Sequence, residues 1–181
     1  MPSSKAKEVA HTAIQRGGTL VFDRTADIVT LDPTQAVDNE TIWADECIYE
    51  TLYKPNQNGT ALVPDMATSY TLSKNHLVWT FNLRHGVDFS NGQEMTSADV
   101  KFSILRVAAK ASNPWTFINS DIKSITTPSK FQVVITTKSP WAPMQADTAL
   151  FANGIIPNNY AGESPSVFWQ HPIGTGAFMV K

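Results

Sequence analysis

The sequence predicts a mixed α/β fold, of the α+β kind, in which a mixed sheet is flanked by helices. Three observations support it: an alternating stretch typical of a strand, a capped stretch with helical spacing behind it, and two short alternating stretches around a turn. The elements follow one another irregularly, which favours local hairpins packed beside helices. The 181 residues are 42% hydrophobic and 17% charged, so we expect a packed core and not a disordered chain.

Charge and hydropathy exclude two kinds of partner. The net charge is −2, and the chain has no basic face of the sort that contacts a phosphate backbone, so nucleic acid is not expected as a partner. No apolar run approaches the ~20 residues that span a bilayer, so direct membrane insertion is not expected. Cys47 is the only cysteine, which rules out an intramolecular disulfide, and we expect it to be half-buried.

The first 36 residues are predicted to contain an arm, a strand and a loop. Residues 1–16 read as a flexible arm, and the two glycines that follow release a strand over Thr19–Phe22. The stretch after this strand is predicted to be a loop, because Asp32 precedes Pro33 and a residue before proline is disfavoured in a helix.

A helix is predicted to begin near Asp38 or Asn39, with Glu40 in its positively polarised first turn. We expect it to run to about Tyr53, because apolar residues recur at helical spacing at Ala44, Ile48 and Leu52. The polar, proline-containing stretch 54–59 ends it.

The most informative stretch runs from Met66 to Lys110. Leu77–Arg84 alternate between apolar and polar residues with a period of two, which predicts a strand with one buried face. Asn91-Gly92 predicts a turn, and Thr96 with Asp99 resembles a capping box at the start of a helix. One apolar stripe of this helix is formed by Val100, Ile104, Val107, Ala108 and Ala111.

The C-terminal half is predicted to hold a hairpin, a helix and a final strand. Ile122–Thr126 and Phe131–Thr136 flank a turn and read as two paired strands. Ser139–Phe151 reads as a helix with a proline in its first turn. Ala177–Lys181 reads as the beginning of another strand.

Four motifs occur in a fixed order along the chain: Leu31-Asp32-Pro33, Leu62–Ala67, the central stretch 66–110, and Pro172–Phe178. Together they resemble the extracellular solute-binding proteins of ABC transporters, in the oligopeptide, dipeptide and nickel class (family 5). The first is similar to the family's Leu-Asp-Pro and the last to its Pro-Val-Gly-Thr-Gly-Pro-Phe. The chain is therefore interpreted as an N-terminal part of such a protein.

The resemblance implies a periplasmic-binding-protein-like lobe and only part of a two-lobed fold that closes on its ligand. By this comparison, residues 17–36 carry the first strand and loop of the main sheet of lobe I. Residues 37–170 form the smaller subdomain of that lobe, and residues 171–181 return to the main sheet in a truncated strand. The second lobe, which supplies much of the ligand cage in the family, is expected to be absent from this chain.

The resemblance also implies which residues face the ligand. In the family the loop after the Asp-Pro runs beside the ligand, and its counterpart here is Val37, Asp38, Asn39, Glu40 and Thr41. An aromatic residue after the signature helix has its counterpart in Trp115, whose indole would pack on a ligand side chain or backbone. Two acidic residues in the loop would favour a ligand with an amino terminus or a cation.

Structural roles for the same residues stay open. Asp38 and Glu40 could instead cap the helix that they precede and complement its dipole. Trp115 could instead be a lid over the core of the subdomain. Trp79 and Phe81 lie on the alternating strand and are expected in the core.

No catalytic residue, metal site or cofactor is predicted, and the chain is not expected to be an enzyme. The four histidines lie too far apart in sequence for a local metal motif. Gly174-Thr175-Gly176 lacks the lysine and the helix start of a phosphate loop. Ser164 lacks the second glycine of a nucleophile elbow.

The function implied by the resemblance is the substrate-binding component of an ABC importer. Such a protein captures peptides or a related small solute in the periplasm or at the cell surface and delivers them to a membrane permease. Without the second lobe, the chain alone is expected to bind weakly. Two alternatives stay open: a nickel or other small-solute binder of the same family, and an isolated lobe that self-associates through exposed strand edges.

Overall fold

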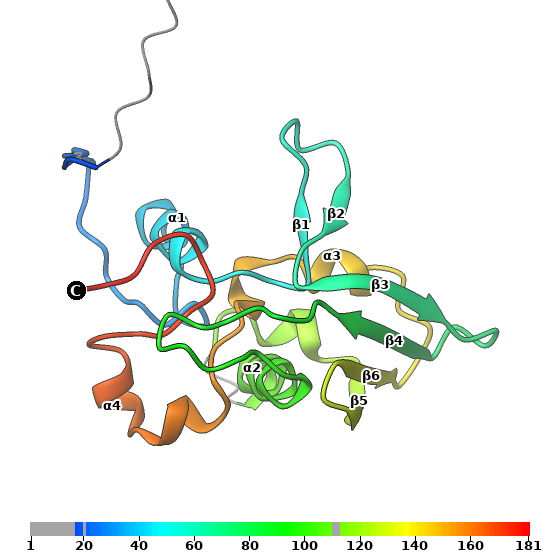
Figure 1. Ribbon diagram of the computed structural model, residues 1–181. Helices are drawn as coiled ribbons and strands as arrows, with labels where there is room; N and C mark the ends of the chain where they lie inside the picture. The colour runs from blue at the N-terminus through cyan, green and yellow to red at the C-terminus, as the bar shows by residue number, and fades with distance from the viewer. Residues whose placement is uncertain (1–16, 20, 110–112) are drawn as a thin grey trace, which may run out of the picture.

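The fold is built around an antiparallel sheet with a two-stranded ribbon and short helices attached to it (Figure 1). The computed structural model describes residues 17–19, 21–109 and 113–181. The predicted arm over 1–16 lies outside these residues, as do Leu20 of the first predicted strand and Ala111 of the predicted helical stripe. The mixed α and β composition predicted from the sequence is confirmed.

The main sheet has the strand order β3-β4-β6-β5. Its strands are β3 (Ala67–Leu72), β4 (Val78–Leu83), β5 (Ile122–Ser129) and β6 (Gln132–Thr137). The predicted alternating strand is confirmed as β4 and the predicted hairpin as β5 and β6. Every strand pair in the described residues is antiparallel, so the expectation of a mixed sheet is wrong for this part of the chain.

A separate ribbon replaces the end of the first predicted helix. Helix α1 spans Asn39–Ile48, and Tyr49 after it has an extended backbone. Strand β1 (Tyr53–Pro55) then pairs with β2 (Leu62–Pro64), and the ribbon projects from the sheet (Figure 1). The prediction of a helix to Tyr53 is wrong, because the carbonyl of Leu52 accepts hydrogen bonds from the amides of residues 65 and 67.

Helix α2 spans Ser97–Ala109 and begins as the sequence predicts. The backbone amide and the hydroxyl of Thr96 both donate to one carboxylate oxygen of Asp99, at 2.7 and 2.6 Å. Val100, Ile104 and Val107 are buried, so the predicted stripe faces the core over the described turns.

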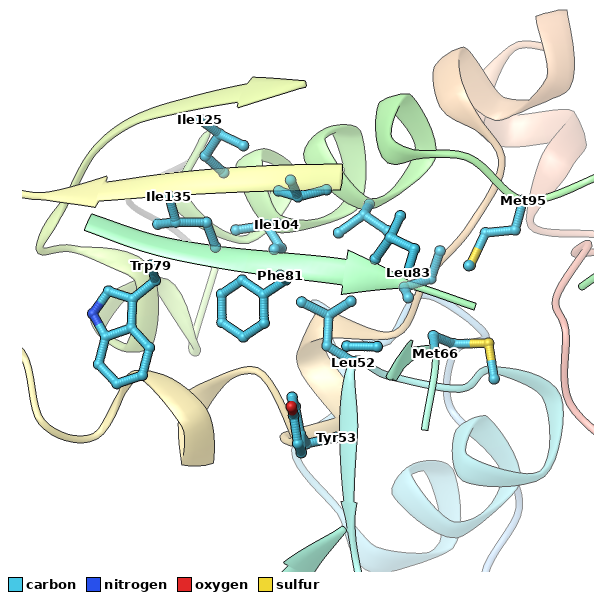
Figure 2. Close-up of a cluster of buried hydrophobic side chains, with 14 of the residues drawn as sticks. Leu52, Tyr53, Met66, Trp79, Phe81, Leu83, Met95, Ile104, Ile125 and Ile135 are labelled. Atoms are coloured by element: carbon cyan, nitrogen blue, oxygen red, sulfur yellow. The ribbon is translucent and has the colours of Figure 1, made fainter. Parts of the chain in front are cut away.

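The core lies on the buried face of the sheet, where α2, β1 and the C-terminal half of the chain meet it. Figure 2 shows Trp79 and Phe81 projecting from the same side of β4 towards Tyr53. Phe81 pairs in register with Val133 of β6, and both are fully buried. Burial of the Trp79 and Phe81 side chains confirms that these two aromatic residues belong to the core.

After α2, the described residues contain only short helices, and the predicted helix over Ser139–Phe151 is wrong. In its place lie α3 (Met144–Asp147) and a 3₁₀ turn, η2 (Phe151–Asn153). A helix from residue 139 would place Pro143 in its interior, where the missing amide and the ring break the helix. The remaining short helices are η1 (Thr116–Asn119), η3 (Asn158–Gly162) and α4 (Pro165–Phe168).

The two terminal segments are not strands in the described residues. The segment after Gly174 runs beside α1 (Figure 1), and the amides of Gly176 and Phe178 donate to the carbonyls of Ile48 and Cys47 at 2.9 and 3.1 Å. The backbone of a strand needs a neighbouring strand as its hydrogen-bond partner. Val21 is 82% exposed, and no described strand pairs with it. The expected strand over 177–181 is absent, and the described residues of the stretch 19–22 form no strand. The assignment of both segments to a main sheet of lobe I stays a prediction.

Candidate functional site

The Leu-Asp-Pro motif is fixed by a largely buried ion pair. One carboxylate oxygen of Asp32 lies 2.6 Å from a guanidinium nitrogen of Arg106 on α2, and it also accepts hydrogen bonds from the amide and hydroxyl of Thr34. The Arg106 guanidinium lies 4.8 Å from the centre of the Trp169 ring. These contacts hold the loop before α1 against α2.

Two hydrogen bonds bring the predicted loop and the predicted tryptophan together. The indole nitrogen of Trp115 donates to the carbonyl of Ala36 at 2.7 Å. The side-chain amide of Gln35 donates to the side-chain oxygen of Asn113 at 2.6 Å. Trp115 therefore lies directly beside the residue that precedes Val37.

The Trp115 ring is half-buried and has aromatic neighbours on the protein side. It meets Phe151 edge-on, with ring centres 4.9 Å apart, and Phe117 lies 6.1 Å away. Phe117 is 61% exposed and Val37 is 69% exposed. The surface around Trp115 therefore presents apolar groups to solvent, while the edge of the indole is bonded to the protein.

The acidic residues of the loop have partners within the chain. Asp38 caps α1: its two carboxylate oxygens accept from the amide and the hydroxyl of Thr41 at 2.8 and 2.9 Å. These hydrogen bonds lower the pKa of the Asp38 carboxyl. The hydroxyl of Thr25 donates to Glu40 at 2.7 Å. The capping role left open by the sequence is therefore observed for Asp38.

The other two loop residues differ in exposure. Asn39 is exposed at the start of α1, whereas Thr41 is fully buried and its hydroxyl oxygen accepts the amide of Val29 at 3.1 Å. Val37 and Asn39 are thus exposed to solvent in this loop, whereas the Thr41 side chain is not.

Sequence reasoning missed an acidic pocket at the C-terminal end of α1. It has a volume of about 460 Å³ and lies between this end of the helix, β1 and the segment 176–178. Asp45, Glu46, Glu50 and Asp65 line it, together with Lys54, whose ammonium nitrogen lies 2.7 Å from Asp65. The signal in the sequence was the stripe Thr41, Asp45 and Ile48, which places a carboxylate on the buried face of α1.

Asp45 is the most perturbed carboxyl of this pocket. The residue is 1% exposed, and neither carboxylate oxygen has a hydrogen-bond partner among the described residues. Burial, followed by the nearby charges of Asp32, Asp38 and Glu46, raises the pKa of Asp45 to about 8. Burial also raises the pKa of Glu46.

Other chemistry in the described part of the chain is limited. No three His, Cys, Asp or Glu side chains within residues 17–19, 21–109 and 113–181 converge in a way that could hold a metal ion. Across the same residues, no helix has the length and apolar character needed to cross a bilayer. Cys47 is exposed, so the expectation of a half-buried thiol is wrong.

The sequence of the chain matches a known protein family. The sequence model of the bacterial extracellular solute-binding proteins, family 5 (Middle), matches residues 61–181. The chain belongs to this family.

Known proteins resemble the chain over most of its length. It is 30% identical to the probable D,D-dipeptide-binding periplasmic protein DdpA of Escherichia coli K12, over 96% of this chain and 35% of that protein. It superposes with a TM-score of 0.74 and 28% identity on the ABC transporter-associated periplasmic binding protein DppA of Helicobacter pylori in complex with the peptide STSA. That superposition covers 84% of this chain and 34% of DppA.

A third relative has a different ligand. NikZ of Campylobacter jejuni, in complex with Ni(L-His), superposes with a TM-score of 0.72 and 27% identity, over 83% of this chain and 30% of NikZ. The chain thus spans about a third of the length of the relatives that it matches. DdpA and DppA are binding proteins by name.

Proposed function

We propose that the chain is part of the substrate-binding component of an ABC importer, which captures a peptide or a related small solute and delivers it to a membrane permease. Membership of family 5 supports this role, as do relatives named for a D,D-dipeptide and crystallised with a peptide. The mechanism is capture without chemistry. The periplasmic relatives support a location outside the cytoplasmic membrane.

The observation that carries the proposal is the contact between Trp115 and the loop before α1. The hydrogen bond from the indole to Ala36 fixes the ring beside Val37, and both side chains remain partly open to solvent. A rigid, half-exposed indole offers large apolar area at low entropic cost. We assign Val37, Asp38, Asn39, Glu40, Thr41 and Trp115 to the wall of the binding cleft, with Thr41 acting through its capping contact with Asp38.

A peptide fits this wall better than a bare metal ion. Nickel would need several nitrogen, sulfur or oxygen ligands, and the described residues contain no such group. A nickel solute would have to bring its own ligands, as Ni(L-His) does in NikZ. The exposed apolar groups around Trp115 instead suit the side chains of a peptide.

The proposal is tested by thermal unfolding of the chain with a mixed di- to pentapeptide pool. At twenty times the dissociation constant, a ligand specific for the folded state adds about 1.8 kcal/mol of stability. For a domain of this size we expect the melting temperature to rise by about 4 to 7 °C. Trp115→Ala should abolish this rise.

The matched control is Trp141→Ala, because Trp141 is also half-buried but its indole donates to Asp147, away from the loop before α1. Each variant is compared with its own melt without peptide. A rise that persists in Trp115→Ala, or no rise in the unaltered chain, would contradict the proposal.

A further inference from the structure

The pocket at the end of α1 contains a buried carboxylate that no described contact explains. Asp45 is 1% exposed and lines this pocket, and both of its oxygens lack a partner among the described residues. A buried carboxylate without a partner is costly, so native structures pair it with a donor or a cation. The single lysine of the pocket, Lys54, is already paired with Asp65.

Several features of the pocket favour a positive charge. Glu46 and Glu50 add two more carboxyl groups to its lining. Helix α1 ends at Ile48 with no basic residue in its last turn, so the negative end of its dipole is not complemented by a side chain of the helix. The remainder of the lining includes apolar and aromatic groups at Tyr49, Phe151 and Phe178, which suit an alkyl stem and can stabilise a cation above a ring.

We propose that this pocket binds the ammonium group of a small organic amine, with Asp45 as the counter-ion and the aromatic lining around the alkyl stem. The pocket volume of about 460 Å³ admits a small amine. A metal ion is the weaker occupant, because it needs several converging ligands and the described residues offer no such group. The site goes beyond the proposed function and does not depend on it.

The pH dependence of binding follows from the groups around Asp45. Burial, followed by the charges of Asp32, Asp38 and Glu46, raises the pKa of Asp45 to about 8. An alkylammonium keeps its charge up to about pH 10, so it must displace the proton of Asp45 at lower pH. The other titratable groups of the lining are Cys47, Tyr49, Glu50, Lys54 and Asp65.

The test is a titration of the isotopically labelled chain with n-butylammonium chloride, read from the carboxyl carbon signals of Asp45 and Glu50. We expect saturable shifts, and about thirtyfold tighter binding near pH 9 than near pH 6.5, which is the change in the ionised fraction of a group with a pKa of about 8. Asp45→Asn should remove the binding and its pH dependence. In this variant the binding is followed through the carboxyl carbon signal of Glu50.

Two controls make the outcome decisive. n-Butanol, a neutral molecule of the same length, should not bind. Asp147→Asn should bind like the unaltered chain, because Asp147 is also a buried aspartate but lies outside the pocket lining. Equal binding of n-butanol, binding retained in Asp45→Asn, or no response up to about 0.1 M near pH 9 would overturn the proposal and leave Asp45 as a protonated structural group only.

Discussion

Arg106 connects three parts of the molecule through one side chain. Its guanidinium pairs with Asp32, and the same group lies over the rings of Trp169 and Tyr160, at 4.8 and 5.5 Å from their centres. The side chains of Arg106 and Asp32 are 10% and 16% exposed. A pair this buried is costly to break, because the remaining charge loses its partner without regaining water.

Arg106→Ala is therefore expected to lower the free energy of unfolding by about 3 kcal/mol, because it leaves the largely buried Asp32 carboxylate without its cation. Urea unfolding followed by circular dichroism measures the loss. Lys130→Ala is the control: the Lys130–Glu94 pair is mostly exposed, and its removal should leave the midpoint nearly unchanged. Equal losses in the two variants would show that burial does not govern the Asp32–Arg106 pair.

Asp45 makes stability depend on pH in the opposite sense to an ordinary carboxylate. Its pKa is about 8 in the folded chain and its ordinary value is 3.8, so the folded state holds the proton more tightly than the unfolded state. The stabilisation is complete below about pH 4 and is lost as the pH rises through about 8. In between, the free energy of unfolding should fall by about 1.4 kcal/mol per pH unit from this group.

The matching variant is Asp45→Asn, which cannot titrate but keeps Glu46 and Glu50. The difference in unfolding free energy between the two proteins, measured by urea unfolding from pH 5 to 9, should therefore change in favour of the asparagine variant up to about pH 8 and then level off. A difference that stays constant over this range would mean that Asp45 is ionised throughout and that its carboxylate has a partner.

At the residue scale, the sequence predicted the roles of those side chains whose partners are close in sequence. The capping by Asp38 and the Thr96–Asp99 pair follow from local spacing, and both are observed. The Asp32–Arg106 pair joins residues 74 positions apart, and no local pattern contains that information. The pocket beside Asp45 was hidden for the same reason, because the C-terminal segment, far from Asp45 in sequence, forms part of its lining.

At the element scale, the segment after residue 172 depends on close contact with α1. A Cβ atom on Gly174 would lie 2.0 Å from the carbonyl oxygen of Ile48, and one on Gly176 would lie 2.5 Å from that of Cys47. Both glycines belong to the Pro172–Phe178 motif that the sequence shows, but the contact that requires them could be found only in the fold. This packing is also what closes the pocket beside Asp45.

Gly174→Ala should detach this segment from α1, because the added methyl group overlaps backbone and not a movable side chain. The expected readout is faster hydrogen exchange at the amides of Gly176 and Phe178, which donate to α1 in the folded chain. Ala177→Ser, at an exposed position, should leave both exchange rates unchanged. Unchanged rates in Gly174→Ala would show that the segment is held by other contacts.

Elements with strong internal signals were predictable, and elements set by distant pairing were not. The strand β4 and the helix α2 are observed as predicted. In each, the apolar residues of the sequence pattern are the residues that the fold buries. The end of α1 depends on the backbone pairing of Leu52 with residues 65 and 67. The absence of a long helix after residue 139 depends on Pro143. The predicted terminal strands need partner strands that the described residues do not contain.

At the scale of the whole molecule, a single wall should bind a solute weakly. Two-sided burial removes a ligand from water and supplies most of its affinity, whereas one wall leaves the opposite side solvated. The relatives that share this fold are about three times as long as the chain. We therefore expect the chain alone to bind peptides with a millimolar and not a micromolar dissociation constant. This corresponds to a binding free energy of ~4 and not ~8 kcal/mol.

The most direct test of the central claim is to map where peptides touch the chain. The chain, labelled with nitrogen-15, is titrated with the mixed di- to pentapeptide pool, and the indole signals of its five tryptophans are followed together with the amides of residues 37–41. We expect fast-exchange shifts at the Trp115 indole and these amides, while the Trp141 indole stays in place. Shifts that spare Trp115 and residues 37–41, or a micromolar affinity, would contradict it.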